Sequence, residues 1–241
     1  MKKIFYILTF LISAFGFSQQ SPAGFLHTEG QRIVDSTNKN VLLKGIGLGG
    51  YMLQEGYMLK VPFKEQQQHV IKEHIQQLIG KEKTEAFYKA WRTNFIQKKD
   101  IDSLKSWGFN SIRLPMHYNL FTLSVEDEPV KGKNTWKQEG FTMVDSLVSW
   151  CKANEMYLIL DMHATPGGQG HDLNISDRDP SKPSLWESKA NRQKLIALWT
   201  KLAERYKDEP GIGAYDIINE PNWTFEGRDK NGREDTLNKP L

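Results

Sequence analysis

Four apolar segments alternate with helical segments, and this alternation limits the possible folds more than any other feature of the chain. The apolar segments are 41–50, 109–115, 156–163 and 213–221. Each is almost continuously apolar, which is typical of strands buried on both faces of a parallel sheet. We therefore expect an α/β protein in which helices cover a parallel sheet.

The stretches between these segments carry helical periodicity. Residues 64–107 contain two or three helical segments, and a further helix is expected at about 139–153. The last helix is expected to begin near Ser184, because Ser184 and Glu187 form a capping-box pattern. Pro210 closes this helix before the last strand.

The ends of the expected strands indicate where a ligand would bind. Each strand ends in glycine or polar residues, and ligands of such folds bind at the carboxyl ends of the strands. No G-x-G-x-x-G or P-loop pattern follows any strand, which disfavours an open sheet that binds a nucleotide cofactor. Periodicity alone does not distinguish an open doubly wound sheet from a closed barrel.

Residues 1–18 have the layout of a secretory signal peptide. Two lysines precede an apolar run that ends at Phe17, and cleavage is expected after Ser18. The run is shorter than the ~20 residues that span a bilayer, so a membrane anchor is disfavoured. We therefore expect residues 19–241 to form a domain that is secreted or periplasmic.

Charge and cysteine content exclude several classes of partner. Loss of residues 1–18 lowers the formal net charge from +3 to about +1, so neither nucleic acid nor an anionic membrane is expected as a partner. Cys151 is the single cysteine, so no disulfide can form within the chain. Its place in the apolar row of a helix predicts a buried, inert thiol.

Polar residues that could carry chemistry follow three consecutive strands. Arg113, His163 and the pair Asn219–Glu220 stand at strand ends. Because the carboxyl ends of parallel strands meet at one edge, a guanidinium, an imidazole, an amide and a carboxyl would share one pocket. Taken singly, each residue has a structural explanation, such as an ion pair for the arginine or a structural role with its hydrogen bonds satisfied for the histidine. Their joint occurrence indicates an active site.

Four motifs give the chain a family resemblance that runs from about residue 41 to its end. In order, they are LLKGIGLGGYM, GFNSIRLP, LILDMHATPGGQG and INEP. With them the chain resembles glycoside hydrolase family 5, the cellulase-like enzymes of the large retaining (β/α)₈ clan. The resemblance implies a (β/α)₈ TIM barrel with only strands 1–4 and their helices in this chain. It also implies an O-glycosyl hydrolase that acts on a β-linked polysaccharide or oligosaccharide.

The resemblance assigns a role to each strand-end residue. Glu220 matches the acid/base, and Asn219 matches the residue that holds the sugar 2-hydroxyl. Arg113 matches the arginine that supports the nucleophile, and His163 matches a residue that lines the substrate site. The chemistry fits, because a carboxyl with a raised pKa can protonate the glycosidic oxygen. Retaining enzymes place the second carboxyl group only ~5–5.5 Å away.

Two loop residues are further candidates for substrate contacts. His117 directly follows the second strand, and Trp223 closely follows the acid/base, where its ring could form a platform for a sugar. The Asp- and Asn-rich stretch 168–184 lacks the spacing of an EF-hand, and His163 and His171 form no zinc pattern. We therefore expect neither a metal nor a cofactor.

The nucleophile that the resemblance implies is a Glu at the end of strand seven, whereas this chain reaches strand four at Glu220. Asp161 lies one layer down in the barrel and Glu226 lies in a polar loop, so neither is a good substitute. We expect a truncated product or an incomplete reading of a longer gene, inactive and poorly soluble without the C-terminal half of the barrel. Two alternatives stay open: a non-catalytic carbohydrate-binding protein or degenerate truncated homologue, and a sister family of the clan.

Overall fold

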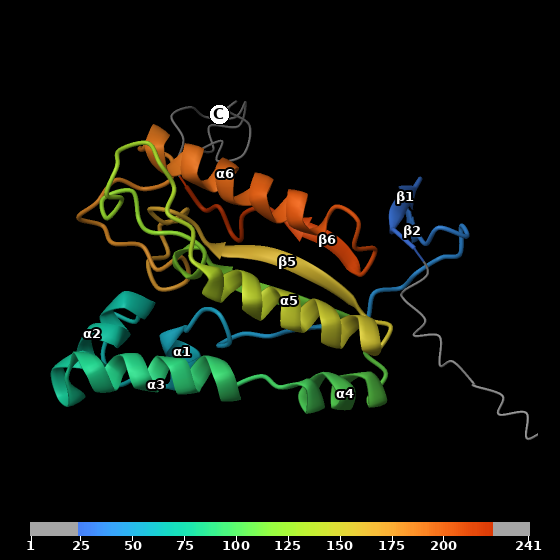
Figure 1. The fold of residues 1–241 in the computed structure, drawn as a ribbon, viewed down its shortest axis with the longest axis horizontal. Coiled ribbons are helices and arrows are strands. Elements are labelled where there is room, and N and C mark those ends of the chain that lie inside the picture. Colours follow the sequence, from blue (N-terminus) through green and yellow to red (C-terminus); the bar gives the residue numbers. More distant parts are fainter. Residues whose placement is uncertain (1–23, 224–241) are drawn as a thin grey trace, which may run out of the picture.

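The computed structural model describes residues 24–223; the expected signal peptide, 1–18, and Glu226 lie outside this part. A four-stranded parallel sheet forms its centre (Figure 1), with the strands in chain order. The strands are β3 (Gly45–Gly47), β4 (Ser111–His117), β5 (Tyr157–Ala164) and β6 (Ile212–Asp216). The expected parallel α/β architecture, with neighbouring strands joined through helices, is therefore confirmed.

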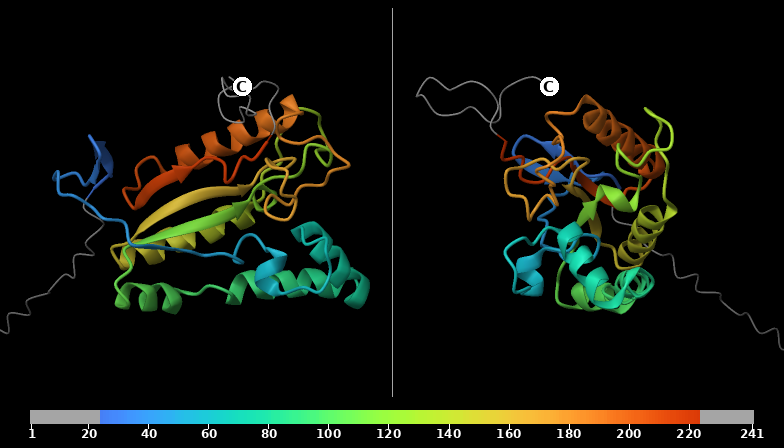
Figure 2. Two further views of the ribbon diagram at one scale, coloured as in Figure 1. Left: turned by 180° about the vertical axis from the view of Figure 1, so that it is seen from behind. Right: turned by 90° about the vertical axis from the view of Figure 1, so that its left-hand side faces the viewer.

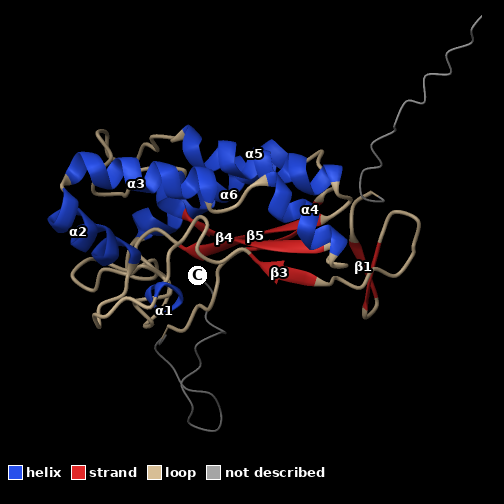
Figure 3. Cartoon of the chain, turned by 90° about the horizontal axis from the view of Figure 1, so that it is seen from below, coloured by secondary structure: helices blue, strands red, loops and turns tan. Residues whose placement is uncertain are grey.

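Six α-helices are present in the described part. They are α1 (Gly56–Leu59), α2 (Gln68–Ile79), α3 (Lys81–Asn94), α4 (Lys98–Ser106), α5 (Gln138–Ala153) and α6 (Lys189–Tyr206). Helices α3 to α6 lie along one face of the sheet (Figure 3), and the other face is turned to the viewer in the left panel of Figure 2. A small antiparallel hairpin, β1 (His27–Glu29) and β2 (Arg32–Val34), precedes the sheet.

The core lies between the sheet and its helices. Alternate side chains of β4 and β5 are fully buried there, together with one face of α5, because successive side chains of a strand point to opposite faces. These residues are Ile112, Leu114, Met116, Leu158, Leu160, Met162, Phe141, Val144 and Leu147. The remaining positions of the two strands, which include Arg113, Asp161 and His163, point to the face of the sheet that helices α3 to α6 do not cover.

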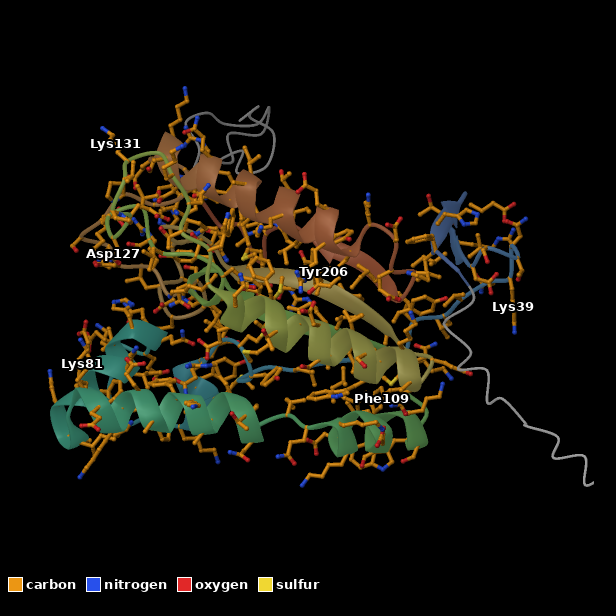
Figure 4. All side chains as sticks on the ribbon, viewed as in Figure 1. Lys39, Lys81, Phe109, Asp127, Lys131 and Tyr206 are labelled. Carbon is orange, nitrogen blue, oxygen red and sulfur yellow. The ribbon has the colours of Figure 1, made fainter. Side chains whose placement is uncertain are left out.

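The outer elements of this layer are tied together by side-chain contacts. Tyr206 (Figure 4), at the end of α6, donates a hydrogen bond to Asp145 Oδ1 of α5 at 2.8 Å.

Cys151 of α5 is buried as expected, and burial raises the pKa of its thiol to about 12. Within residues 24–223, no helix has both the length and the apolar character to cross a bilayer.

Three expected boundaries were wrong. The first strand covers only Gly45–Gly47 rather than 41–50, and its three residues are exposed rather than buried. The last helix begins at Lys189, where Ser188 accepts a hydrogen bond from Asn191 N, rather than near Ser184. Ser184 and Glu187 do form the hydrogen bonds of a capping box, but across a turn that precedes the helix. The last strand ends at Asp216 and not at 221, because the chain bends after it.

Candidate active site

Arg113 is the centre of the polar cluster at the carboxyl end of the sheet. Its Nη2 atom lies 2.8 Å from Asp216 Oδ2 and 3.0 Å from Asp161 Oδ2. The same atom donates a hydrogen bond to Asn219 Oδ1 at 2.8 Å. Because Asp161 of β5 pairs in register with Asp216 of β6, the guanidinium of β4 meets carboxylates from the next two strands of the sheet. The arginine therefore links three strands.

Asn219 is held by its backbone as well as by Arg113. Its N–H donates to Met162 O at 3.1 Å, and its carbonyl accepts from Gln169 Nε2 at 2.8 Å. The buried Gln169 also donates to His163 O at 2.7 Å, so one amide joins the ends of β5 and β6. The side chain of Asn219 is thus presented to the site in a single orientation, with its oxygen on Arg113.

His163 contacts carboxylates with both ring nitrogens. Its Nδ1–H donates to Asp161 Oδ2 at 2.7 Å, and its Nε2 lies 3.5 Å from Glu55 Oε1. Burial lowers the pKa of His163, but the hydrogen bonds and charges of Asp161 and Glu55 outweigh it and raise this pKa to about 9. Burial also raises the pKa of Asp161, against the opposing effects of His163 and Arg113. His163 is therefore protonated at neutral pH.

Glu220 lies beside this cluster and is exposed. Its φ of 41° is in the left-handed region, which residues other than glycine seldom adopt. Such backbone conformations concentrate at functional sites. Three effects raise the pKa of Tyr57 in α1: the charge of Glu55 is the largest, burial comes next, and the charge of Glu220 is the smallest. The Tyr57 hydroxyl and the two carboxylates consequently share one electrostatic neighbourhood.

Trp223 packs against the loop that follows β5. Its ring stacks on His171, with the ring centroids 4.4 Å apart, and the Arg178 guanidinium lies 4.8 Å from its centroid. Asn222 fastens the same segment, because its Oδ1 accepts from His171 N at 2.8 Å. The aromatic ring is thus held within a few residues of Glu220.

His117 is almost fully buried, and its ring contacts Asp177. Its Nδ1 accepts from Asn119 N at 3.1 Å, so its Nε2–H is the donor to Asp177 Oδ2 at 2.8 Å. His69 of α2 donates to the other oxygen, Oδ1, from Nδ1 at 2.7 Å. Burial raises the pKa of Asp177, but the two histidines outweigh it and lower this pKa to about 2.

A cavity of about 350 Å³ lies beside this second cluster. His69, His117, Asp177, Lys137 and Asp127 (Figure 4) contribute to its polar walls. Glu220 does not line it, so the cavity is separate from the acid/base candidate. Across residues 24–223, no group of three or more His, Cys, Asp or Glu is arranged to hold a metal ion.

The structure therefore brings Arg113, His163 and Asn219 into direct contact, next to Glu220, and leaves His117 in another cluster. Sequence reasoning missed Glu55, Asp216 as the partner of Arg113, and Gln169. These residues come from three segments that are distant in sequence: Glu55 from the segment before α1, Asp216 from the end of β6, and Gln169 from the loop after β5. Gln169 lies within the quoted motif LILDMHATPGGQG, which is the one signal that could have indicated it.

Known proteins resemble this chain in sequence and in fold. A family model described as Cellulase (glycosyl hydrolase family 5) matches residues 65–237. A "Beta-xylosidase" of Phanerodontia chrysosporium is 34% identical over 204 residues, which are 85% of this chain and 41% of that protein. "Endoglucanase C" of Acetivibrio thermocellus is 30% identical over 136 residues, 56% of this chain and 36% of that protein. The chain thus spans less than half the length of these two relatives.

The fold comparison agrees with the family match. The solved structure of rutinosidase from Aspergillus niger aligns with a TM-score of 0.58 at 19% identity, over 80% of this chain and 53% of that one. At this identity the likeness supports the fold alone, which is that of the first four strands of a (β/α)₈ barrel. The family model covers well over half of the sequence, and the chain belongs to glycosyl hydrolase family 5.

Proposed function

We propose that this chain supplies the acid/base side of a retaining glycoside hydrolase that acts on β-linked glycans. The observation that carries the proposal is the network in which Arg113 orients Asn219 directly beside Glu220. A buried, oriented amide next to an exposed carboxyl suits a site that holds a sugar hydroxyl beside the bond to be cleaved. Membership of glycosyl hydrolase family 5 supports the same chemistry.

In the proposed reaction Glu220 protonates the glycosidic oxygen as the bond to the anomeric carbon breaks. A nucleophilic carboxylate from beyond residue 241 attacks that carbon and forms a covalent glycosyl-enzyme. Glu220 then removes a proton from the water that releases the sugar. Asn219 binds the 2-hydroxyl through its Nδ2–H group, and His163 and Trp223 line the sugar site. We also propose that residues 1–241 alone are inactive, because they lack the nucleophile.

The substrate class is proposed from the relatives. Their names are those of a β-xylosidase and an endoglucanase, and β-linked xylose and glucose units both present an equatorial 2-hydroxyl. His117 contributes to substrate binding in this proposal only indirectly, through Asp177 and the loop after β5, because its ring is buried. The composition of residues 1–18 supports export of the mature protein.

The test uses the secreted gene product that carries residues 1–241, with its N-terminal mass measured to locate the expected cleavage after Ser18. Glu220→Ala should lower kcat/KM on unactivated β-glycans by roughly 10²–10⁴-fold, the usual contribution of a general acid/base. With 4-nitrophenyl β-D-glucoside, which needs little protonation, azide should restore turnover and give the β-glycosyl azide.

Glu204→Ala, at an exposed position of α6, is the matched control and should keep wild-type rates. An active Glu220→Ala variant, or an azide product of inverted configuration, would refute the proposal. Binding of β-glucan without any hydrolysis by the intact protein would instead favour a non-catalytic carbohydrate-binding protein.

A further inference from the structure

Glu55 is a buried carboxylate that none of the proposed steps uses. It directly precedes α1, and only 6% of its surface is exposed. Among the described residues, His163 is the cationic group with which it forms an ion pair, at 3.5 Å between Oε1 and Nε2. A buried carboxylate is costly unless a charged or hydrogen-bonding partner compensates it. Glu55 therefore favours the protonated form of His163.

The same ring nitrogen has a second neighbour. Asn219 Nδ2 lies 3.4 Å from His163 Nε2, and its amide cannot turn round because Arg113 donates to its oxygen. A neutral His163 with its proton on Nδ1 can accept a hydrogen bond from Asn219 at Nε2. A protonated His163 has no acceptor there, and its positive charge faces Glu55 Oε1, which lies 3.5 Å from Nε2.

We infer that Glu55 is a positioning residue, which holds a proton on His163 and thereby frees the Nδ2–H group of Asn219 for the sugar 2-hydroxyl. The inference rests on the proposed function, in which Asn219 binds that hydroxyl. Loss of the proton to solvent lets the Nε2 atom of His163 accept a hydrogen bond from one of the two N–H groups of Asn219 Nδ2, and the site then loses that donor for the substrate. Asp161 and Glu55 thus affect substrate binding indirectly, through the hydrogen bonds that the Asn219 amide can make.

The charges around His163 support this assignment. Asp161 faces the ring from β5 and Glu55 faces it from the segment before α1, whereas Arg113 of β4 is engaged by Asp161 and Asp216 of β6. Asn219, the neighbour from the end of β6, is neutral. Asp161 and Glu55 thus place two negative charges beside His163. The positive charge of Arg113 is offset by Asp216, so the net field favours the protonated imidazole.

The first test measures the proton itself, in the gene product that carries residues 1–241, labelled with ¹³C and ¹⁵N histidine. The ring signal of His163 is assigned from the spectrum of His163→Gln and followed by NMR as pH is raised. Glu55→Gln should lower the pKa of His163 by about 1–3 units, the usual effect of removing an opposite charge at this distance. Glu65→Gln, an exposed position of the same connection, should leave it unchanged.

Glu55→Asp keeps the charge on a shorter side chain and should retain much of the elevated pKa, which covers the case in which Glu55→Gln fails to fold. An unchanged His163 titration in Glu55→Gln, or a pKa equally low in Glu55→Asp and Glu55→Gln, would overturn the inference. Because the readout is an NMR titration, it decides this point whether or not the protein hydrolyses glycosides.

The second test links the proton to the sugar hydroxyl. At pH 8, Glu55→Gln should lose about tenfold more kcat/KM on 4-nitrophenyl β-D-glucoside than on its 2-deoxy analogue, because one hydrogen bond is worth about that factor. Equal losses on both glycosides would mean that Glu55 only supports the fold. A wild-type protein that hydrolyses neither glycoside would refute the proposed function, while the NMR titration still decides whether Glu55 holds the proton.

Discussion

Asp177 should be the principal acid-sensitive contact of the loop that follows β5. Both of its oxygens accept hydrogen bonds from histidines, and Oδ1 also accepts from His69 N at 2.9 Å. Asp177→Asn removes the charge but keeps the shape, and asparagine tolerates the φ of 49° at this position. The amide can serve as acceptor on one side only, so its NH₂ group faces a histidine donor on the other.

The structure gives the magnitude of this effect. A carboxyl whose pKa falls from 3.8 to about 2 on folding contributes about 2 kcal/mol at neutral pH. Because the folded-state pKa is the lower one, the contribution is complete above the unfolded value of 3.8 and is lost as pH falls through 2. By the same relation it is about 1 kcal/mol at pH 3.

Urea unfolding of wild type and Asp177→Asn, followed by tryptophan fluorescence at pH 7 and pH 3, measures both values. The difference in unfolding free energy should be about 2 kcal/mol at pH 7 and about half that at pH 3. Asp172→Asn, an exposed change in the same loop, is the control and should be neutral at both. A difference that stays constant between the two pH values would refute the reasoning, because the charge would then not be the source.

Two further predictions concern the helical layer. Lys194→Met should cost about 3–5 kcal/mol of stability, because it strands the buried carboxylate of Glu128, and the double variant with Glu128→Gln should recover part of this loss in urea unfolding. A Lys194→Met protein as stable as wild type would contradict this. Cys151 should not react with a thiol reagent at pH 8 until urea unfolds the protein, because burial raises its pKa to about 12; rapid labelling of native protein would show that the thiol is accessible.

The parts of the fold that follow from local patterns were predicted from the sequence. The parallel strands β3 to β6 and the helices between them follow from apolar periodicity, which tertiary contacts did not override. Arg113, His163 and Asn219 meet because they come from consecutive strands of one parallel sheet. The expected strand-end position holds for His163, whereas Arg113 lies within β4 and Asn219 lies three residues after β6. Family motifs then gave their proposed roles.

The missed parts depend on contacts between distant segments. His69 and Asp177 are joined only by the path of a long loop, and no periodicity reports that path. Glu55 lies in an irregular segment whose direction is set by packing. The capping-box pattern at Ser184 was misread because its hydrogen bonds suit a turn as well as a helix start. In each case the local signal was real, but its structural meaning depended on distant residues.

The bend after β6 has a direct consequence for the site. Strand alternation predicts that Asp216 and Glu220 share a face, but Trp199 Nε1 binds Ile217 O and Met162 O binds Asn219 N, which ends the strand early. Asn219 therefore turns toward Arg113, and Glu220 is left exposed in a left-handed conformation. Within residues 24–223 its carboxylate has no ion-pair partner, whereas Asn219 is held at three atoms. This chain thus orients the group that would hold the sugar and leaves the carboxylate of the proposed acid/base exposed beside it.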